Sequence, residues 1–335
     1  MKILLTGGAG YVGSHVLRQV LEAGHEPIVF DDLSNGHAEA VGDADLVQGD
    51  ILDADVLRRV FARDRFDCVM HFCGLIEPGE SVERPDRYYR VNVVGGLNLL
   101  DAMITAGVKC IVFSSSAATY GDPESLPIDE DHPTVPVNPY GWSKLTFEHV
   151  LETYRQAFDL GYVSLRYFNA AGADASGEIG EAHRHETHLI PLVLRAALTG
   201  GTFTVFGDDY DTRDGTAVRD FVHVTDLARA HLDALEVLTP GSGHVYNLGS
   251  GTGHTVNEVV ETAREVTGRD IASTVGPRRP GDPPSLVASS ARIERDLGWK
   301  PQYTRLADTV RSAWTWHHTH PDGFGTSPDK DLATS

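Results

Sequence analysis

The segment KILLTGGAGYVGSHVLRQVLEAG, residues 2–24, runs from a short apolar stretch through closely spaced glycines into an amphipathic stretch. Gly7, Gly10 and Gly13 stand three residues apart, directly after the apolar stretch. Glycines let a backbone approach a pyrophosphate, and the start of a helix supplies unpaired N–H groups and a positive dipole. The segment therefore predicts a strand, a phosphate-binding turn and a helix that bind a dinucleotide. A plain tight turn is the competing interpretation.

A similar alternation continues along the chain. The apolar, β-branched runs are KILLT, PIVFD, DLVQGD, DCVMHF, CIVFSSS and YVSLRYFN, and candidate helices lie near 12–23, 53–64, 86–107 and 139–159. Strands that alternate with helices of this length form βαβ units and a parallel sheet covered on both faces. The sequence thus predicts an α/β fold: a doubly wound parallel (Rossmann-type) sheet with a smaller α+β substrate-binding domain.

The pattern loosens after Asn169, where AAGADASGEIGEAHRHETH is polar and rich in Gly, Ala and His. We expect a dinucleotide-binding domain over 1–170 that also receives segments near 220–250. An interleaved smaller domain over 171–320 and a frayed tail over 323–335 should follow. The length of 335 residues agrees with about two domains.

Composition and charge exclude several classes of protein. With 41% hydrophobic and 23% charged residues the chain is an ordinary globular one, and its net charge of −20 opposes binding to nucleic acid or to an anionic membrane. Cys68, Cys73 and Cys110 are odd in number and lie in or beside apolar runs, as reduced core residues of a cytoplasmic protein do. We expect neither a metal site, nor a secretory signal, nor a membrane span.

The run PIVFDD ends on Asp31 and Asp32, and Asp31 lies eighteen residues after Gly13. A carboxylate at this point accepts hydrogen bonds from the adenosine ribose hydroxyls of a dinucleotide. The negative charge would repel a 2′-phosphate, and no arginine stands beside it to offset the repulsion. NAD is therefore favoured over NADP, with a simple polar turn as the alternative.

Tyr140 and Lys144 stand at positions i and i+4 of a predicted helix, on one face. The preceding Asn138-Pro139 is a helix-start signal, so Tyr140 should lie in the first turn. An ammonium, the helix dipole and a nicotinamide cation all favour phenolate and would move the phenol below its ordinary pKa of about 10. Such a tyrosine can act as a general base, although an exposed helix pair is the plainer interpretation.

Ser116 ends the run CIVFSSS, where ligands bind at the carboxyl end of a central strand in doubly wound sheets. Its hydroxyl could bind the same substrate hydroxyl that Tyr140 deprotonates. Serines at strand ends are also ordinary caps and turn residues.

Nine segments together resemble the UDP-glucose 4-epimerases of the extended short-chain dehydrogenase/reductase superfamily over roughly residues 1–320. In order, they are TGGAGYVGSH, HFCGL, GESV, YYRVN, FSSSAATYGD, NPYGWSK, RYFNAAGA, VRDFVHVTDLA and RRPGDPP. The resemblance implies reversible NAD-dependent inversion at C4 of a UDP-hexose through a 4-keto intermediate, with UDP-glucose and UDP-galactose the first choice. It also implies a cytoplasmic homodimer that joins through helices near 86–107 and 139–159.

Alternatives to this reaction remain. One is an epimerase of another UDP-sugar, such as an N-acetylhexosamine, uronate or pentose. A nucleotide-sugar dehydratase or decarboxylase would need a carboxylate just after Ser116, where this chain has Ala117 and Ala118. A catalytically silent NAD-binding sensor would tend to lose the Tyr140 and Lys144 pair.

By the resemblance, Tyr140 is the base, Lys144 its partner and a ligand of the nicotinamide ribose, and Ser116 the second hydroxyl. The implied NAD contacts are Gly7, Gly10, Tyr11, Val12, Gly13, Asp31, Asp32, Asn35, Asp50, Ile51, Phe72, Asn92, Ser114, Tyr140, Lys144 and Phe168. The implied substrate contacts are Ser116, Tyr140, Asn169, His188, Leu189, Phe206, Arg219, Arg279, Asp282 and Leu286, of which Arg219 and Arg279 clamp the diphosphate. The chain departs from the family at Ile76 (often lysine), Cys73 (usually alanine) and His188 (commonly asparagine).

Overall fold

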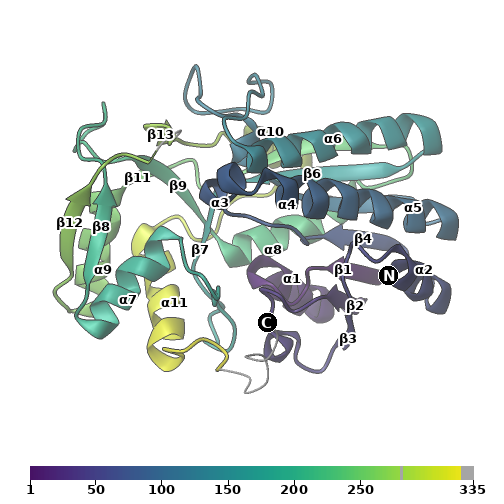
Figure 1. Ribbon diagram of the computed structural model, residues 1–335, viewed down its shortest axis with the longest axis horizontal. Helices are drawn as coiled ribbons and strands as arrows, with labels where there is room; N and C mark the ends of the chain where they lie inside the picture. Colours follow the sequence, from purple (N-terminus) through teal and green to yellow (C-terminus); the bar gives the residue numbers. More distant parts are fainter. Residues whose placement is uncertain (280–281, 326–335) are drawn as a thin grey trace.

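A computed structural model describes residues 1–279 and 282–325 (Figure 1). Its main sheet has seven strands in the order β10-β6-β5-β4-β1-β2-β3, and every neighbouring pair is parallel. The strands are β1 (Lys2–Thr6), β2 (Glu26–Asp31), β3 (Asp45–Gln48), β4 (Cys68–His71), β5 (Cys110–Ser116), β6 (Gly161–Tyr167) and β10 (Gly243–Leu248). The predicted Rossmann-type parallel sheet is confirmed.

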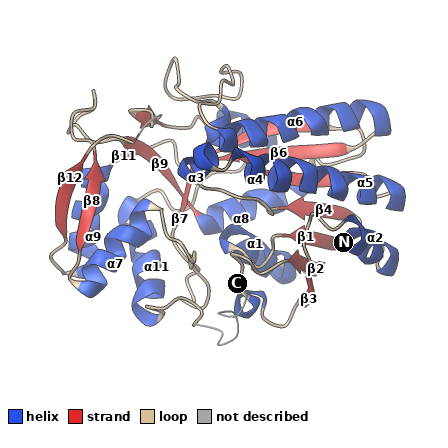
Figure 2. Cartoon of the chain, viewed as in Figure 1, coloured by secondary structure: helices blue, strands red, loops and turns tan. Residues whose placement is uncertain are grey.

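Helices cover both faces of this sheet (Figure 2). Along β1, Ile3 and Leu5 join one core while Leu4 joins the other, because successive side chains of a strand point to opposite faces. The first core includes residues of α1 (Tyr11–Glu22) and α8 (Val224–Asp233). The second includes residues of α2 (Ala54–Arg63), α5 (Gly96–Ala106) and α6 (Pro139–Phe158).

The helix expected near 86–107 is interrupted. Residues of α3 (Pro78–Glu83) and α4 (Pro85–Tyr88) lead into a π-helical turn, η2 (Tyr89–Gly95), before α5 begins. A side chain at Gly96 would have its Cβ 2.3 Å from the ring of Phe147 on α6. Glycine at this point lets the two helices pack closely.

The second part of the molecule lies to the left in Figure 1. It has two small sheets, one of β11, β9 and β13 with β7 on β9, the other of β12 and β8. Its elements are β7 (Asn169–Ala171), α7 (Leu189–Thr199), β8 (Thr202–Phe206), β9 (Val218–His223), β11 (Gly253–Thr255), α9 (Val256–Thr267), β12 (Ala272–Gly276), β13 (Ser285–Leu286) and α11 (Leu306–Thr319). Between them the chain returns to the main sheet, where α8 packs on α1 and β10 forms the edge; α10 (Ala291–Leu297) packs beside β10.

Three short 3₁₀ turns complete the described chain: η1 (Ala38–Val41), η3 (Ala117–Thr119) and η4 (Ala234–Glu236). The predicted frayed tail lies mostly outside the described residues. Its described part differs from the prediction, because the ring of Phe324 packs 4.8 Å from that of Trp316 and 5.0 Å from that of His37. None of the helices in the described ranges is both long and apolar enough to cross a membrane.

Candidate active site

The glycine loop between β1 and α1 is shaped by close backbone contacts. Gly7 has φ +76°, and a Cβ there would lie 2.5 Å from the backbone nitrogen of Cys73 at the end of β4. A Cβ at Gly13 would lie 2.3 Å from the carbonyl oxygen of Gly7. Gly10 caps α1 without a side-chain hydrogen bond, so the first N–H groups of the helix remain available to an anion.

Asp31 lies at the end of β2 and is only 6% exposed. One of its carboxylate oxygens accepts from the backbone N–H of Ala9 at 3.0 Å and the other from that of Leu33 at 2.9 Å. Burial raises the pKa of Asp31, against the lowering effect of these two hydrogen bonds. The side chain of Asp32 accepts from the backbone N–H of Ser34 at 2.8 Å, so the polar turn also forms. The bond from Ala9 connects the Asp31 carboxylate to the glycine loop.

Tyr140 lies in the first turn of α6, as the Asn138-Pro139 signal predicts. The Asn138 side chain caps the helix by accepting from the N–H of Gly141 at 2.9 Å. Lys144 is 3% exposed, and its Nζ lies 6.0 Å from the ring centroid of Tyr140. Ser116 ends β5, and its hydroxyl, which accepts from the backbone N–H of Ala118 at 3.1 Å, is close enough to act on the pKa of the Tyr140 phenol. The three predicted catalytic side chains therefore meet at the carboxyl edge of the sheet.

The charge state of this group depends mainly on burial. Burial raises the pKa of Tyr140, and the nearby Ser116 hydroxyl only partly offsets the rise. Burial also lowers the pKa of Lys144 to about 8, and its Nζ donates to the carbonyl oxygen of Ser114 at 2.9 Å. The predicted lowering of the phenol pKa included the charge of a bound nicotinamide and stays a prediction, since in the chain by itself desolvation is the largest influence on this pKa.

A buried ion pair fixes α6 against the sheet. Glu148, one turn after Lys144, accepts from the Ser115 hydroxyl at 2.5 Å and pairs with Arg166 of β6 at 2.6 Å. Arg166 also donates to Tyr120 at 2.9 Å. These contacts set the position of α6 relative to the strand that carries Ser116. Sequence reasoning missed them because the partners come from separate elements.

Asn92 binds the segment that follows β4. Its side chain accepts from the N–H of Leu75 at 2.8 Å and donates to the Leu75 carbonyl at 3.0 Å and to the Ser143 hydroxyl at 2.9 Å. A Cβ at Gly74 would lie 3.0 Å from Oδ1 of Asn92 and 3.5 Å from Nζ of Lys144. Asn92 and Lys144 therefore both lie where a side chain of residue 74 would start, and glycine at this position leaves room for them.

The other predicted cofactor contacts lie around this edge. Tyr11 donates to the carbonyl of Gly172 at 2.6 Å, Val12 packs at the core beneath it, and Asn35 lines a small cavity with Gly10 and Tyr11. Asp50 accepts from the N–H of Leu52 at 2.8 Å, and Ile51 is buried against Gly95. Phe72 packs beside His231. Of the two nearby positions that depart from the family pattern, Cys73 has a thiol whose pKa is raised by burial, and Ile76 is 36% exposed.

The predicted substrate residues gather along β9 and β13. Arg219 pairs with Asp282, whose N–H donates to the carbonyl of Arg279 at 3.3 Å. The Arg279 guanidinium lies 4.2 Å from the ring centroid of Phe206. Leu286 is in register with Arg219 across the two strands.

Leu286 also packs against a buried cluster that contains Ala117 and Phe168, next to Ser116. Asn169, which follows Phe168, opens β7 and pairs with Phe221 of β9.

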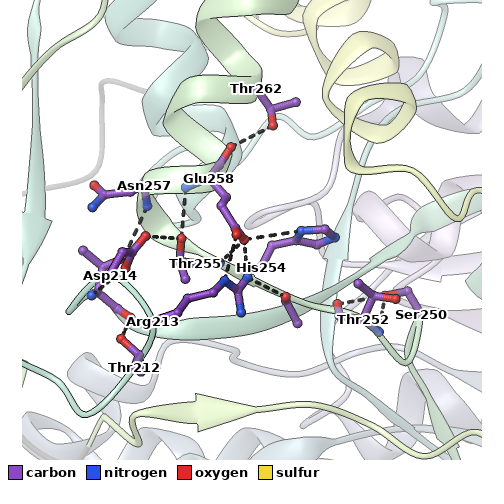
Figure 3. A network of polar contacts seen from close by, with 12 residues as sticks. Thr212, Arg213, Asp214, Ser250, Thr252, His254, Thr255, Asn257, Glu258 and Thr262 are labelled. Carbon is purple, nitrogen blue, oxygen red and sulfur yellow. Dashed lines mark hydrogen bonds and ion pairs between the residues drawn. The ribbon is translucent and has the colours of Figure 1, made fainter.

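The support for β9 comes from the loop before it (Figure 3). Arg213 donates to the Glu258 carboxylate at 2.7 Å, and Asp214 accepts from the Thr255 hydroxyl at 2.5 Å. Thr255 and Glu258 form a capping box at the start of α9. The loop is thus fastened to α9, which helps to hold the strand that carries Arg219.

The predicted substrate residue His188 belongs to a cluster of acidic and histidine side chains. It precedes Leu189 at the start of α7, and its Nδ1 contacts the carboxylate of Glu181. His183 and Glu186 complete the cluster. Sequence reasoning named only His188 of these four, although the spacing in EAHRHETH was a signal for the others.

Comparison with known proteins agrees with this geometry. The NAD dependent epimerase/dehydratase family matches residues 3–249. A UDP-glucose 4-epimerase of Halalkalibacterium halodurans is 49% identical over 97% of this chain and 98% of its own length. This chain belongs to the UDP-glucose 4-epimerase family.

Two further members of the family show how far the likeness extends. The UDP-glucose 4-epimerase of Corynebacterium glutamicum is 51% identical over 94% of this chain and 95% of its own length. The solved UDP-glucose 4-epimerase of Bifidobacterium longum, in complex with NAD+ and UDP, is 39% identical, with a TM-score of 0.93 over 97% of this chain and 100% of its own. The likeness therefore covers both the glycine loop and the β9–β13 region.

Proposed function

We propose that this chain is an isomerase that interconverts UDP-glucose and UDP-galactose by NAD-dependent epimerisation at C4. The observation that carries the proposal is the meeting of Tyr140, Lys144 and Ser116 beside the glycine loop. Family membership at 49% identity over nearly the whole chain supports it. The absence of a carboxylate at Ala117 and Ala118 argues against dehydration.

The residues present fit NAD. The loop at Gly7 and Gly13 leaves no room for a Cβ, α1 offers free N–H groups, and Asp31 places a carboxylate beside them. When bound, NAD supplies an acceptor that takes the C4 hydride and returns it. We propose that the cofactor contacts named from the family resemblance hold it in a domain of residues 1–170 with segments near 220–250, and that residues 171–320 bind the UDP-sugar.

Proton transfer falls to the chain's own side chains. Tyr140 takes the proton of the sugar 4-hydroxyl, and Ser116 hydrogen bonds to the same oxygen. The ammonium of Lys144 stabilises the phenolate by charge. Arg219 and Arg279 bind the diphosphate, for which Arg219 must exchange part of its pairing with Asp282.

We expect the purified protein to convert UDP-galactose to UDP-glucose with no added reductant, because the hydride is returned in each cycle. Chromatography of the nucleotide sugars after incubation tests this. A mixture of the two sugars supports the proposal. A 4-keto-6-deoxy product, or unchanged UDP-galactose in protein that contains NAD, would refute it.

Cofactor choice gives the next prediction. NAD should co-purify, and NADP should not restore activity to stripped enzyme, because Asp31 repels a 2′-phosphate. The Asp31→Ala, Asp32→Arg double variant should shift preference toward NADP, as measured by activity after reconstitution with each cofactor. The single variant Asp32→Arg keeps the Asp31 bonds to Ala9 and Leu33 and serves as the control. Equal use of both cofactors by the wild type would show that Asp31 does not meet the ribose.

We propose that Leu286 makes the enzyme prefer UDP-glucose over UDP-sugars with an N-acetyl group at C2. Leu286 packs on the cluster of Ala117 and Phe168 beside Ser116, and the family resemblance implies that this position lines the space around the C2 substituent of the sugar. Overpacking costs roughly 1–3 kcal/mol, so kcat/KM for UDP-glucose should exceed that for UDP-N-acetylglucosamine by at least ~10-fold. Leu286→Ser should narrow the gap. A lower melting temperature with an unchanged ratio would make Leu286 a packing residue only.

We also propose a homodimer in the cytoplasm. Tyr89 and Val94 of η2 and Trp142 and Phe158 of α6 are large apolar side chains that are 40% to 46% exposed. They belong to the two regions that the family resemblance assigns to the interface. The unpaired cysteines support a reducing compartment.

A further inference from the structure

Four side chains between β7 and α7 converge outside the three catalytic groups. Glu181, His183, Glu186 and His188 each place one oxygen or nitrogen within 4.8 Å of the others. The side chains of Glu181, Glu186 and His183 are 4%, 9% and 15% exposed. From this geometry we propose that the four residues form a binding site for a divalent first-row transition ion such as zinc.

The donor set and spacing carry the proposal. Two imidazoles and two carboxylates are a common nitrogen and oxygen set for zinc, whose bonds to them are about 2.0–2.2 Å. Ligands of a tetrahedral ion with bonds of about 2.0–2.1 Å lie about 3.3–3.4 Å apart. Nδ1 of His183 lies 3.3 Å from Oε1 of Glu181 and 3.5 Å from Oε2 of Glu186. The separations of the His183 nitrogen from both carboxylate oxygens are therefore already close to the required value.

The fourth donor, Nδ1 of His188, contacts Oε1 of Glu181, and the His188 side chain is 37% exposed. An ion bound between these two atoms would move them apart. Metal ligation uses neutral imidazole and ionised carboxylate, and metal binding to such groups releases protons.

The surroundings hold the ligands in place. Oε1 of Glu186 accepts from the N–H groups of Thr187 and His188, both at 2.8 Å, which leaves Oε2 to face His183. The backbone carbonyl of Glu181 accepts from the indole of Trp316 on α11 at 3.0 Å. Such supporting contacts orient first ligands in metal sites.

A fifth nitrogen lies in the same region. Nε2 of His317 is buried and has no hydrogen-bond partner among the described residues, and the charges of Glu181 and Glu186 act on this imidazole. The His183 ring also packs edge-on against Tyr11 at 6.2 Å. A bound ion would thus tie the glycine loop and α11 to the start of α7, a structural role that does not depend on the proposed reaction.

The test uses tag-free protein treated with chelator, dialysed and titrated calorimetrically with ZnCl₂. We expect one ion per chain with release of protons, and cobalt as substitute should give the strong visible absorption of a tetrahedral site. In Glu186→Gln the amide oxygen can still accept from the N–H groups of Thr187 and His188, but the carboxylate oxygen that faces His183 is replaced by an NH₂ group that cannot bind a metal ion. This variant should bind zinc at least ~10-fold more weakly. His183→Ala should do the same.

The control is His185→Ala, since His185 lies within the same segment but is exposed and outside the cluster. It should bind zinc as the wild type does. Less than one-tenth of an ion bound by the wild type would overturn the proposal, as would equal binding in Glu186→Gln. If both ligand variants fail to fold, the wild-type cobalt spectrum decides, and absence of the tetrahedral absorption refutes the site.

Discussion

Tyr140→Phe should retain bound NAD and lose at least ~100-fold in turnover, because general-base catalysis contributes about 10²–10⁴-fold. The ring remains, so its packing near Lys144 and the helix start at Asn138 should be kept. Only the hydroxyl that takes the proton is removed. The measurement is kcat for UDP-galactose, together with the NAD content and melting temperature of the variant.

Ser116→Ala is the matched control for this prediction. It removes the hydroxyl that lies near Tyr140, while Tyr140 can still reach the sugar. Its loss of turnover should be smaller. Near-normal turnover in Tyr140→Phe would contradict the assigned base, and a larger loss in Ser116→Ala would mean that the two roles are exchanged.

Gly13→Ala should have the second large effect. Its new Cβ would lie 2.3 Å from the Gly7 carbonyl oxygen and 2.8 Å from Cα of Gly8, so backbone must move on one side or the other. Overpacking of this kind costs roughly 1–3 kcal/mol of stability. A displacement of about 1 Å at a binding loop costs about 100-fold in turnover. We expect protein that is isolated with little NAD and a lower melting temperature.

Gly79→Ala is the control, since a Cβ at Gly79 on α3 meets no atom within 4 Å. This variant should keep its NAD, and its helix should be no less stable, because alanine is the better helix former. If Gly13→Ala retained wild-type NAD content and turnover, the glycine loop would not have the tight geometry described for it.

The sequence predicted the features that depend on local spacing. The β1 strand, the glycine loop and α1 were predicted from the apolar stretch, the spaced glycines and the amphipathic stretch within 23 residues. The proximity of Tyr140 and Lys144 was predicted from their positions on one face of a helix. The carboxyl-edge position of Ser116 followed from its place at a strand end. In each case, neighbours in the chain determine the geometry.

Features made by distant segments were not predictable in this way. The Glu148–Arg166 pair depends on which strands lie beside α6, and the carbonyl of Ser114 is presented to Lys144 only by the folded sheet. The same holds for the raised pKa of Tyr140, since burial is a property of the assembled site. The close spacing in EAHRHETH marked the residues of the cluster at Glu181 as candidates, but their convergence comes from an irregular segment whose path no periodicity predicts.

The central claim is that one hydride leaves C4 of the sugar and returns to the same carbon from the other side. The most direct measurement follows deuterium at C4 of UDP-glucose while the enzyme forms UDP-galactose in ordinary water. We expect the deuterium to stay at C4 of the product, because the hydride is held by the bound cofactor and does not exchange with solvent. Product that carries hydrogen from water at C4 would contradict it.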